Sequence, residues 1–153
     1  MKTLNLYSFL LTIAFSLFGL VSSAQYTESE LQEMYMDFLS DEGIEGFIDS
    51  DGDVQFDYNG RNYFIEVSEE DQEFFRVVLF NLWPIESTSE AVEVAFACDA
   101  VNRQMKVAKA YTLDDNVWIA CELFVGSPRD FKSVWNRCLD AIERGVDVFV
   151  SEM

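Results

Sequence analysis

The first side chains in the sequence that could do chemistry are the carboxylates of IDSDGDVQFDYNG, residues 48–60. Four aspartates stand at or near every second position: Asp49, Asp51, Asp53 and Asp57. A calcium loop spaces its carboxylates in this way, but it also needs glycine at position six and glutamate at position twelve. Counted from Asp49, those positions hold Val54 and Gly60. The stretch therefore favours a strand between two turns, with its acids in solvent, and weak calcium binding is the alternative.

Two other acidic groups also favour turns. Residues 114–116 are Asp-Asp-Asn, which tolerate left-handed backbone and bond their own backbone, so a metal site or an acid pair is the less favoured interpretation. Residues 69–71, Glu-Glu-Asp, indicate a solvated turn, with contact to a basic partner as the alternative. Lys106 and Lys109 are predicted to pair with nearby acids on the surface.

The sequence has few of the residues that nucleophilic catalysis requires. The chain contains no histidine, which removes Ser-His and Cys-His pairs and the commonest general base. Its three cysteines, Cys98, Cys121 and Cys138, each fall on an apolar stripe, which favours buried free thiols over one disulfide or a reactive thiol. We therefore predict no catalytic, cofactor-binding or metal-binding residue and no cofactor. The alternative is an enzyme that uses Asp or Glu chemistry without histidine.

Residues 1–24 have the pattern of a signal peptide. Lys2 is followed by a short apolar run at residues 9–21 and then by Ser22-Ser23-Ala24, the small residues that a signal peptidase requires. A retained anchor is the alternative, although the run is shorter than the ~20 residues of a membrane span. We expect an exported protein, periplasmic or secreted, whose mature chain forms one domain over residues 25–153 with no membrane span.

The charge of the chain limits its partners. The sequence has 28 acidic and 10 basic residues, a formal net charge of −18. Such acidity repels phosphate backbones, which excludes nucleic acid and favours a basic partner. An aromatic content of 15% favours a packed core over disorder.

Periodicity predicts an α+β domain with the element order α-β(3-4)-α-β(2)-α. Helices are expected near residues 27–42, 88–105 and 128–153, and the first two begin with capping boxes at Thr27/Glu30 and Ser87/Glu90. Strands are expected near residues 44–48, 53–58, 61–67, 74–83, 106–112 and 116–125, with a tight hairpin at Asn59-Gly60 and a strand end at Trp83-Pro84. The buried stripe of the middle helix is expected to hold six residues: Ala91, Val94, Ala95, Cys98, Val101 and Met105.

Two segments carry a family resemblance. DGDVQFDYNGRNYFIEVSEEDQEFFRVVLFNLWPI (residues 51–85) and VNRQMKVAKAYTLDDNVWIACELF (residues 101–124), with the Pro-led final helix, resemble the YbjN-domain family of bacterial proteins, often described as sensory transduction regulators. The resemblance implies a type III secretion chaperone-like fold, in which helices pack on a strongly twisted antiparallel sheet. It implies no catalytic residues. The type III chaperones act in the cytoplasm, whereas this chain begins with a predicted leader.

The apolar strands are the best sequence-based indication of function. FFRVVLF and VWIACELF are apolar on both faces, and three helices do not easily cover both faces of such a sheet. Part of the apolar surface, with Phe75, Trp118 and Phe124 as candidates, is either sheltered by the middle helix or offered to a partner. The leading hypothesis is a non-enzymatic module that binds a protein, a peptide or a second copy of itself.

Overall fold

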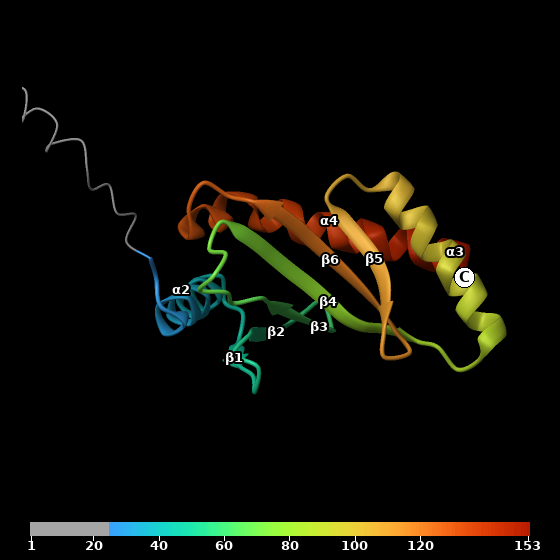
Figure 1. Cartoon of the computed structure of the whole chain (residues 1–153), viewed down its shortest axis with the longest axis horizontal. Coiled ribbons are helices and arrows are strands. Elements are labelled where there is room, and N and C mark those ends of the chain that lie inside the picture. The colour runs from blue at the N-terminus through green and yellow to red at the C-terminus, as the bar shows by residue number, and fades with distance from the viewer. Residues whose placement is uncertain (1–24) are drawn as a thin grey trace, which may run out of the picture.

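Residues 25–153 are the part of the chain that the computed structural model describes, and the predicted leader at residues 1–24 lies outside it. The helices are α2 (Glu28–Asp41), α3 (Thr88–Gln104) and α4 (Phe131–Glu152), the last preceded by a 3-10 turn at Pro128–Asp130 (Figure 1). The strands are β1 (Gly46–Ile48), β2 (Val54–Tyr58), β3 (Arg61–Ile65), β4 (Phe74–Pro84), β5 (Ala108–Leu113) and β6 (Asn116–Phe124). The predicted α+β class and element order are confirmed.

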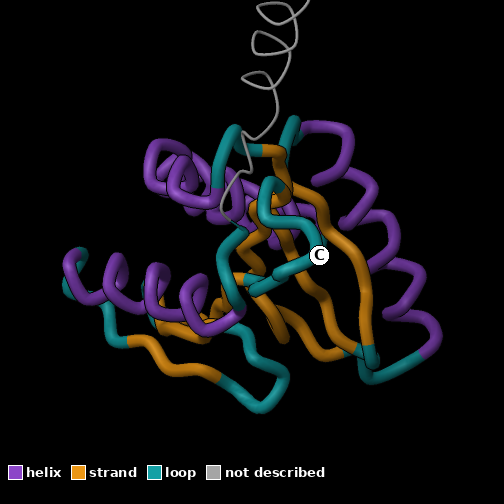
Figure 2. The backbone as a smooth tube through the Cα atoms, turned by 60° about the vertical axis from the view of Figure 1, so that its left-hand side comes forward, coloured by secondary structure: helices purple, strands orange, loops and turns teal. Residues whose placement is uncertain are grey.

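The strands form one antiparallel sheet in the order β1-β2-β3-β4-β6-β5. Their direction changes strongly across the sheet, so that the layer is twisted (Figures 1 and 2). The predicted hairpin between β2 and β3 is confirmed, with Asn59 at φ 53° and Gly60 at φ 74°. Both angles lie in the left-handed region that a tight hairpin turn requires.

Helix α2 begins where its sequence predicts. The Thr27 hydroxyl accepts a hydrogen bond from the Glu30 N–H at 3.3 Å, and the Glu30 carboxylate accepts one from the Thr27 N–H at 2.8 Å. This reciprocal pair satisfies two of the N–H groups that the start of a helix leaves without partners. Hydrogen bonds with Thr27 also lower the pKa of Glu30, the bond from the backbone N–H more than the one with the hydroxyl.

The cap of α3 follows the prediction only in part. Ser87 accepts from the Glu90 N–H at 3.2 Å, as expected. The Glu90 carboxylate, however, accepts from the Glu86 N–H at 2.7 Å and from the Trp83 indole at 2.9 Å. Glu90 therefore ties α3 to the end of β4 and does not return a hydrogen bond to Ser87.

The prediction of the buried stripe of α3 is wrong for three of its six residues. Ala91, Ala95 and Met105 are half-buried or exposed, whereas Ala97 and Ala100 are buried. The reason is that α3 packs against two neighbours, α4 and β5. Small side chains let the helix approach both, and the buried face is rotated from the stripe that one neighbour would select.

The predicted end of β4 at Trp83-Pro84 is confirmed, since the strand ends at Pro84. Pro84 pairs with Asn116 of β6 after a register shift between Leu79 and Trp83. Within the shift, Asn81 adopts φ 53°. Proline is tolerated here because β3 pairs with β4 only as far as Leu79, so the far side of Pro84 has no strand that needs an N–H.

All three helices pack on one face of the sheet. The main core joins α2, α3 and α4 to alternate residues of β2 to β6. At its centre the Phe131 ring meets Tyr35 and Phe38 at 4.9 Å between centroids and Phe75 at 5.5 Å. The opposite face carries a second, smaller cluster made of strand residues alone.

One edge of the sheet, β5, is capped at a single residue by a side chain. Asn102 of α3 donates from Nδ2 to the Ala110 carbonyl at 3.0 Å and accepts from the Ala110 N–H at 2.8 Å. Its amide thus takes the place of a neighbouring strand at β5. Such pairing satisfies backbone groups that an edge strand otherwise leaves open.

We expect Asn102→Ala to lower the free energy of unfolding by about 1–3 kcal/mol, because it leaves two partly buried backbone groups without partners. Urea unfolding followed by circular dichroism measures this. Asn136→Ala is the matched control, since Asn136 is exposed on α4, and it should change stability by less than about 0.5 kcal/mol. Equal effects of the two substitutions would contradict the assigned role of Asn102.

Candidate functional site

Three of the four aspartates in residues 48–60, Asp49, Asp51 and Asp53, lie in the β1–β2 turn, and Asp57 lies in β2. Asp49 accepts from the Asp51 and Asp53 N–H groups at 2.9 and 3.1 Å and from the Gln55 side chain at 2.7 Å. Partial burial raises the pKa of Asp49 and these hydrogen bonds lower it, and the lowering prevails. Gly52 has φ 91°, so the turn at Asp51-Gly52 is confirmed. Asp49 therefore organises the turn, and residues 25–153 contain no cluster of three or more potential metal ligands.

The acidic turn predicted at residues 114–116 is confirmed. Asp114 and Asp115 both have positive φ, 48° and 59°, between β5 and β6. This left-handed backbone is the conformation for which Asp and Asn are suited.

The three cysteines are buried and are free thiols in the structure. Burial raises the pKa of Cys98 to about 11. The Cys121 thiol has a raised pKa because of its hydrogen bond with Cys138 and its burial. None of these positions has the exposure that a nucleophilic thiol needs.

We expect the thiols to be unreactive in the native protein. For Cys98, whose ordinary pKa is 9.0, a pKa of about 11 reduces the thiolate fraction near neutral pH by about 100-fold. Ellman's reagent should label the native protein slowly and label three thiols at once in urea. Fast labelling of one thiol in the native protein would support the reactive-thiol alternative.

Stability should fall at alkaline pH. Burial raises the pKa of Cys98 from 9.0 to about 11 and that of Tyr35 from 10.0 to about 12. The unfolded chain therefore releases these protons first, and stability present below about pH 9 is lost as the pH rises through about 11. Urea unfolding at about pH 8 and pH 10.5 measures the loss, and Cys98→Ala should reduce it. Equal loss in the wild type and in Cys98→Ala would contradict the contribution of this thiol.

The three residues predicted for an interaction surface do not lie together. Phe75 is only 2% exposed and packs between Tyr35 of α2 and Phe131 at the start of α4, so it is not on an accessible surface. Its shelter comes from α2 and α4 and not from the middle helix. Trp118 and Phe124 project from the opposite face of the sheet, where Phe124 is 76% exposed.

That opposite face, here called the open sheet face, carries four aromatic side chains in mutual contact. They come from four strands: Phe64, Phe80, Tyr111 and Trp118. The Trp118 ring lies 5.9 Å from Phe64, 5.8 Å from Phe80 and 6.3 Å from Tyr111 between centroids. Its indole Nε1–H is buried and has no acceptor in the part of the chain that the structure describes.

A charged row lies beside these rings on the same face. Arg76 donates to Glu66 at 2.5 Å, to Glu122 at 3.2 Å and to the Tyr111 hydroxyl at 2.7 Å. Lys109 also pairs with Glu122, as predicted for a surface cation. Arg76 of β4 thereby links β5, β6 and the residue that follows β3 across the face that no helix covers.

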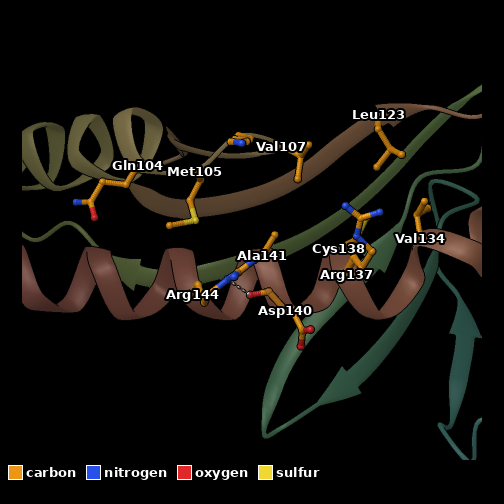
Figure 3. A pocket seen from close by; sticks show the side chains of 11 residues that line it. Gln104, Met105, Val107, Leu123, Val134, Arg137, Cys138, Asp140, Ala141 and Arg144 are labelled. Atoms are coloured by element: carbon orange, nitrogen blue, oxygen red, sulfur yellow. Dashed lines mark hydrogen bonds between the residues drawn. The ribbon is translucent and has the colours of Figure 1, made fainter.

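A second surface feature lies on the helix side. It is a groove of about 460 Å³ between α4 and the connector from α3 to β5 (Figure 3). Met105, Val107 and Leu123 line one side, and Cys138 and Ala141 of α4 line the other.

The rim of this groove carries cations that sequence reasoning missed. Lys106, Arg137 and Arg144 surround it, together with Gln104 and Asp140. None of the three cations forms an ion pair among residues 25–153. The predicted surface pairing of Lys106 is therefore wrong. No local motif marks these positions, since they are brought together from separate elements.

A family model matches residues 32–125, which run from within α2 to just past the end of β6. It describes the family as "Putative bacterial sensory transduction regulator" and is named YbjN. The chain belongs to the YbjN family. The solved structure of YbjN from E. coli, titled "a putative transcription regulator", is similar to this chain with a TM-score of 0.57.

This chain and the E. coli chain share 14% sequence identity, and the likeness covers 74% of this chain and 87% of the E. coli chain. At that identity the likeness establishes the fold. No curated protein matches the chain. In residues 25–153, no helix is both long and apolar enough to cross a membrane.

Proposed function

We propose that this protein is an exported, non-enzymatic regulatory module that binds a protein or peptide on its open sheet face. The observation that carries the proposal is the aromatic cluster around Trp118, which three helices leave uncovered because all of them pack on the other face. Contiguous apolar surface of this kind is typical of binding sites, and tryptophan and tyrosine are frequent among residues that dominate binding energy.

The family description supports a regulatory role, and the charge indicates how such a role would be exerted. A net charge of −18 repels DNA, so regulation would act through a protein partner. The same charge attracts a partner with basic residues.

Export is proposed from residues 1–24. Mass spectrometry of the protein from its own host should find a mature N-terminus at Gln25 in the periplasm or medium. An intact N-terminus in the cytoplasm would overturn this part of the proposal.

The binding surface is tested by two matched substitutions. Phe124 on the open sheet face and Phe96 on α3 are 76% and 71% exposed, so alanine at either position should leave the fold intact. We expect a partner cross-linked and captured from the native compartment to bind Phe124→Ala at least about tenfold more weakly, and Phe96→Ala unchanged. Equal binding to both variants, or light scattering that shows a stable homodimer through this face, would overturn the proposal.

A further inference from the structure

We propose that the groove between α4 and the α3–β5 connector binds a small amphiphilic carboxylate, an aliphatic chain that ends in one negative charge. The groove lies on the helix side of the sheet, away from Trp118 and Phe124. The proposal is therefore independent of the function proposed for the open sheet face.

The floor of the groove is suited to an aliphatic chain. Met105, Leu123 and Val134 are half-buried beside it, and Cys138 and Ala141 are 2% and 4% exposed at its base. A volume of about 460 Å³ falls within the range of roughly 300–1,000 Å³ that small-molecule sites occupy. The lining has no aromatic ring on which a nucleotide base could stack, which favours an aliphatic ligand.

The rim is suited to a single anionic group. Arg137 and Arg144 lie two turns apart on α4, and Lys106 projects from the connector. The Arg144 Nε–H donates to the Asp140 carbonyl at 3.2 Å, and the terminal nitrogens of Arg144 are left to bind a ligand. The planar guanidinium fork matches the geometry of a carboxylate.

The rim brings several cations together in an acidic chain. Acids outnumber bases by 28 to 10, yet three of the ten bases stand here without a carboxylate partner among residues 25–153. Asp140 is the one carboxylate in the lining. Asp140 and the overall negative charge disfavour a polyanion such as a nucleoside triphosphate, whereas a monoanion with an apolar body meets both the cations and the floor.

Decanoate below its micelle concentration is the probe, and 1-decanol and decyltrimethylammonium are the neutral and cationic controls. In an amide NMR titration of the purified protein, decanoate should shift resonances of residues 104–107 and 134–144. It should bind at least about tenfold more tightly than either control, because a charge-assisted contact is lost in both. Absence of binding at millimolar decanoate, or shifts confined to the open sheet face, would overturn the proposal.

Charge variants test the rim. Arg137 and Arg144 are exposed, so the double variant R137Q/R144Q should fold normally and bind decanoate at least about tenfold more weakly. Arg103→Gln is the matched control, because Arg103 is an exposed cation on α3 that pairs with Asp99 at 3.1 Å and lies outside the lining. Equal weakening by R103Q and the double variant would indicate unspecific charge attraction and would overturn the proposal.

Discussion

Phe131→Ala should lower the free energy of unfolding by about 3–5 kcal/mol, the cost of deleting a fully packed aromatic side chain. The Phe131 side chain is 0% exposed, and its ring touches Tyr35, Phe38 and Phe75. The substitution therefore leaves a cavity at the junction of α2, α4 and the sheet. Urea unfolding followed by tryptophan fluorescence measures the loss.

Phe124→Ala is the matched control for this prediction. The same atoms are removed, but the Phe124 side chain is 76% exposed, so stability should change by less than about 0.5 kcal/mol. If both alanine variants lost similar stability, the assignment of Phe131 to the core and of Phe124 to the open sheet face would be wrong.

Arg76→Met should lower the free energy of unfolding by about 2 kcal/mol. Arg76 offsets the charges of Glu66 and Glu122, and its removal leaves two carboxylates without that partner. Breaking a fully buried pair costs about 3–5 kcal/mol, and the 24% exposure of the Arg76 side chain reduces that figure. Thermal and urea unfolding measure the effect.

Two further variants separate this charge effect from a packing effect. Lys109→Met removes a cation whose side chain is 63% exposed and should cost less than about 1 kcal/mol. Adding Glu122→Gln to Arg76→Met should restore part of the loss, because it removes one of the two carboxylates that Arg76 offsets. A double variant that loses the sum of the single losses would contradict coupling between Arg76 and Glu122.

Elements specified by local interactions could be predicted from the sequence. The Thr27/Glu30 cap, the Asn59-Gly60 turn and the alternation of Val54 and Phe56 each depend on residues within one turn or one strand. The interactions that form these features are short-range, so the local sequence is enough to predict them. The class and element order follow from these local features.

Features that depend on which elements become neighbours could not be predicted in the same way. Phe75 and Phe124 both occur in strands apolar on two faces, and only the placement of α2 and α4 decides that Phe75 is buried. The register shift of β4 between Leu79 and Trp83 depends on how β4 pairs with β6. The rim of the groove likewise brings together Lys106 of the α3–β5 connector and Arg137 of α4, which are far apart in the sequence.

The Asn102 amide at β5 also bears on how copies of this protein can assemble. Fibrils built by strand addition need two open edges on each molecule, one to receive and one to offer. Here the β5 edge is blocked at Ala110, and the other edge is β1, a strand of only three residues. Two copies joined through β1 would close as a symmetric pair whose remaining edges are both capped at Ala110. The Asn102 contact at Ala110 and the short β1 strand thus limit strand addition at the two edges of the sheet.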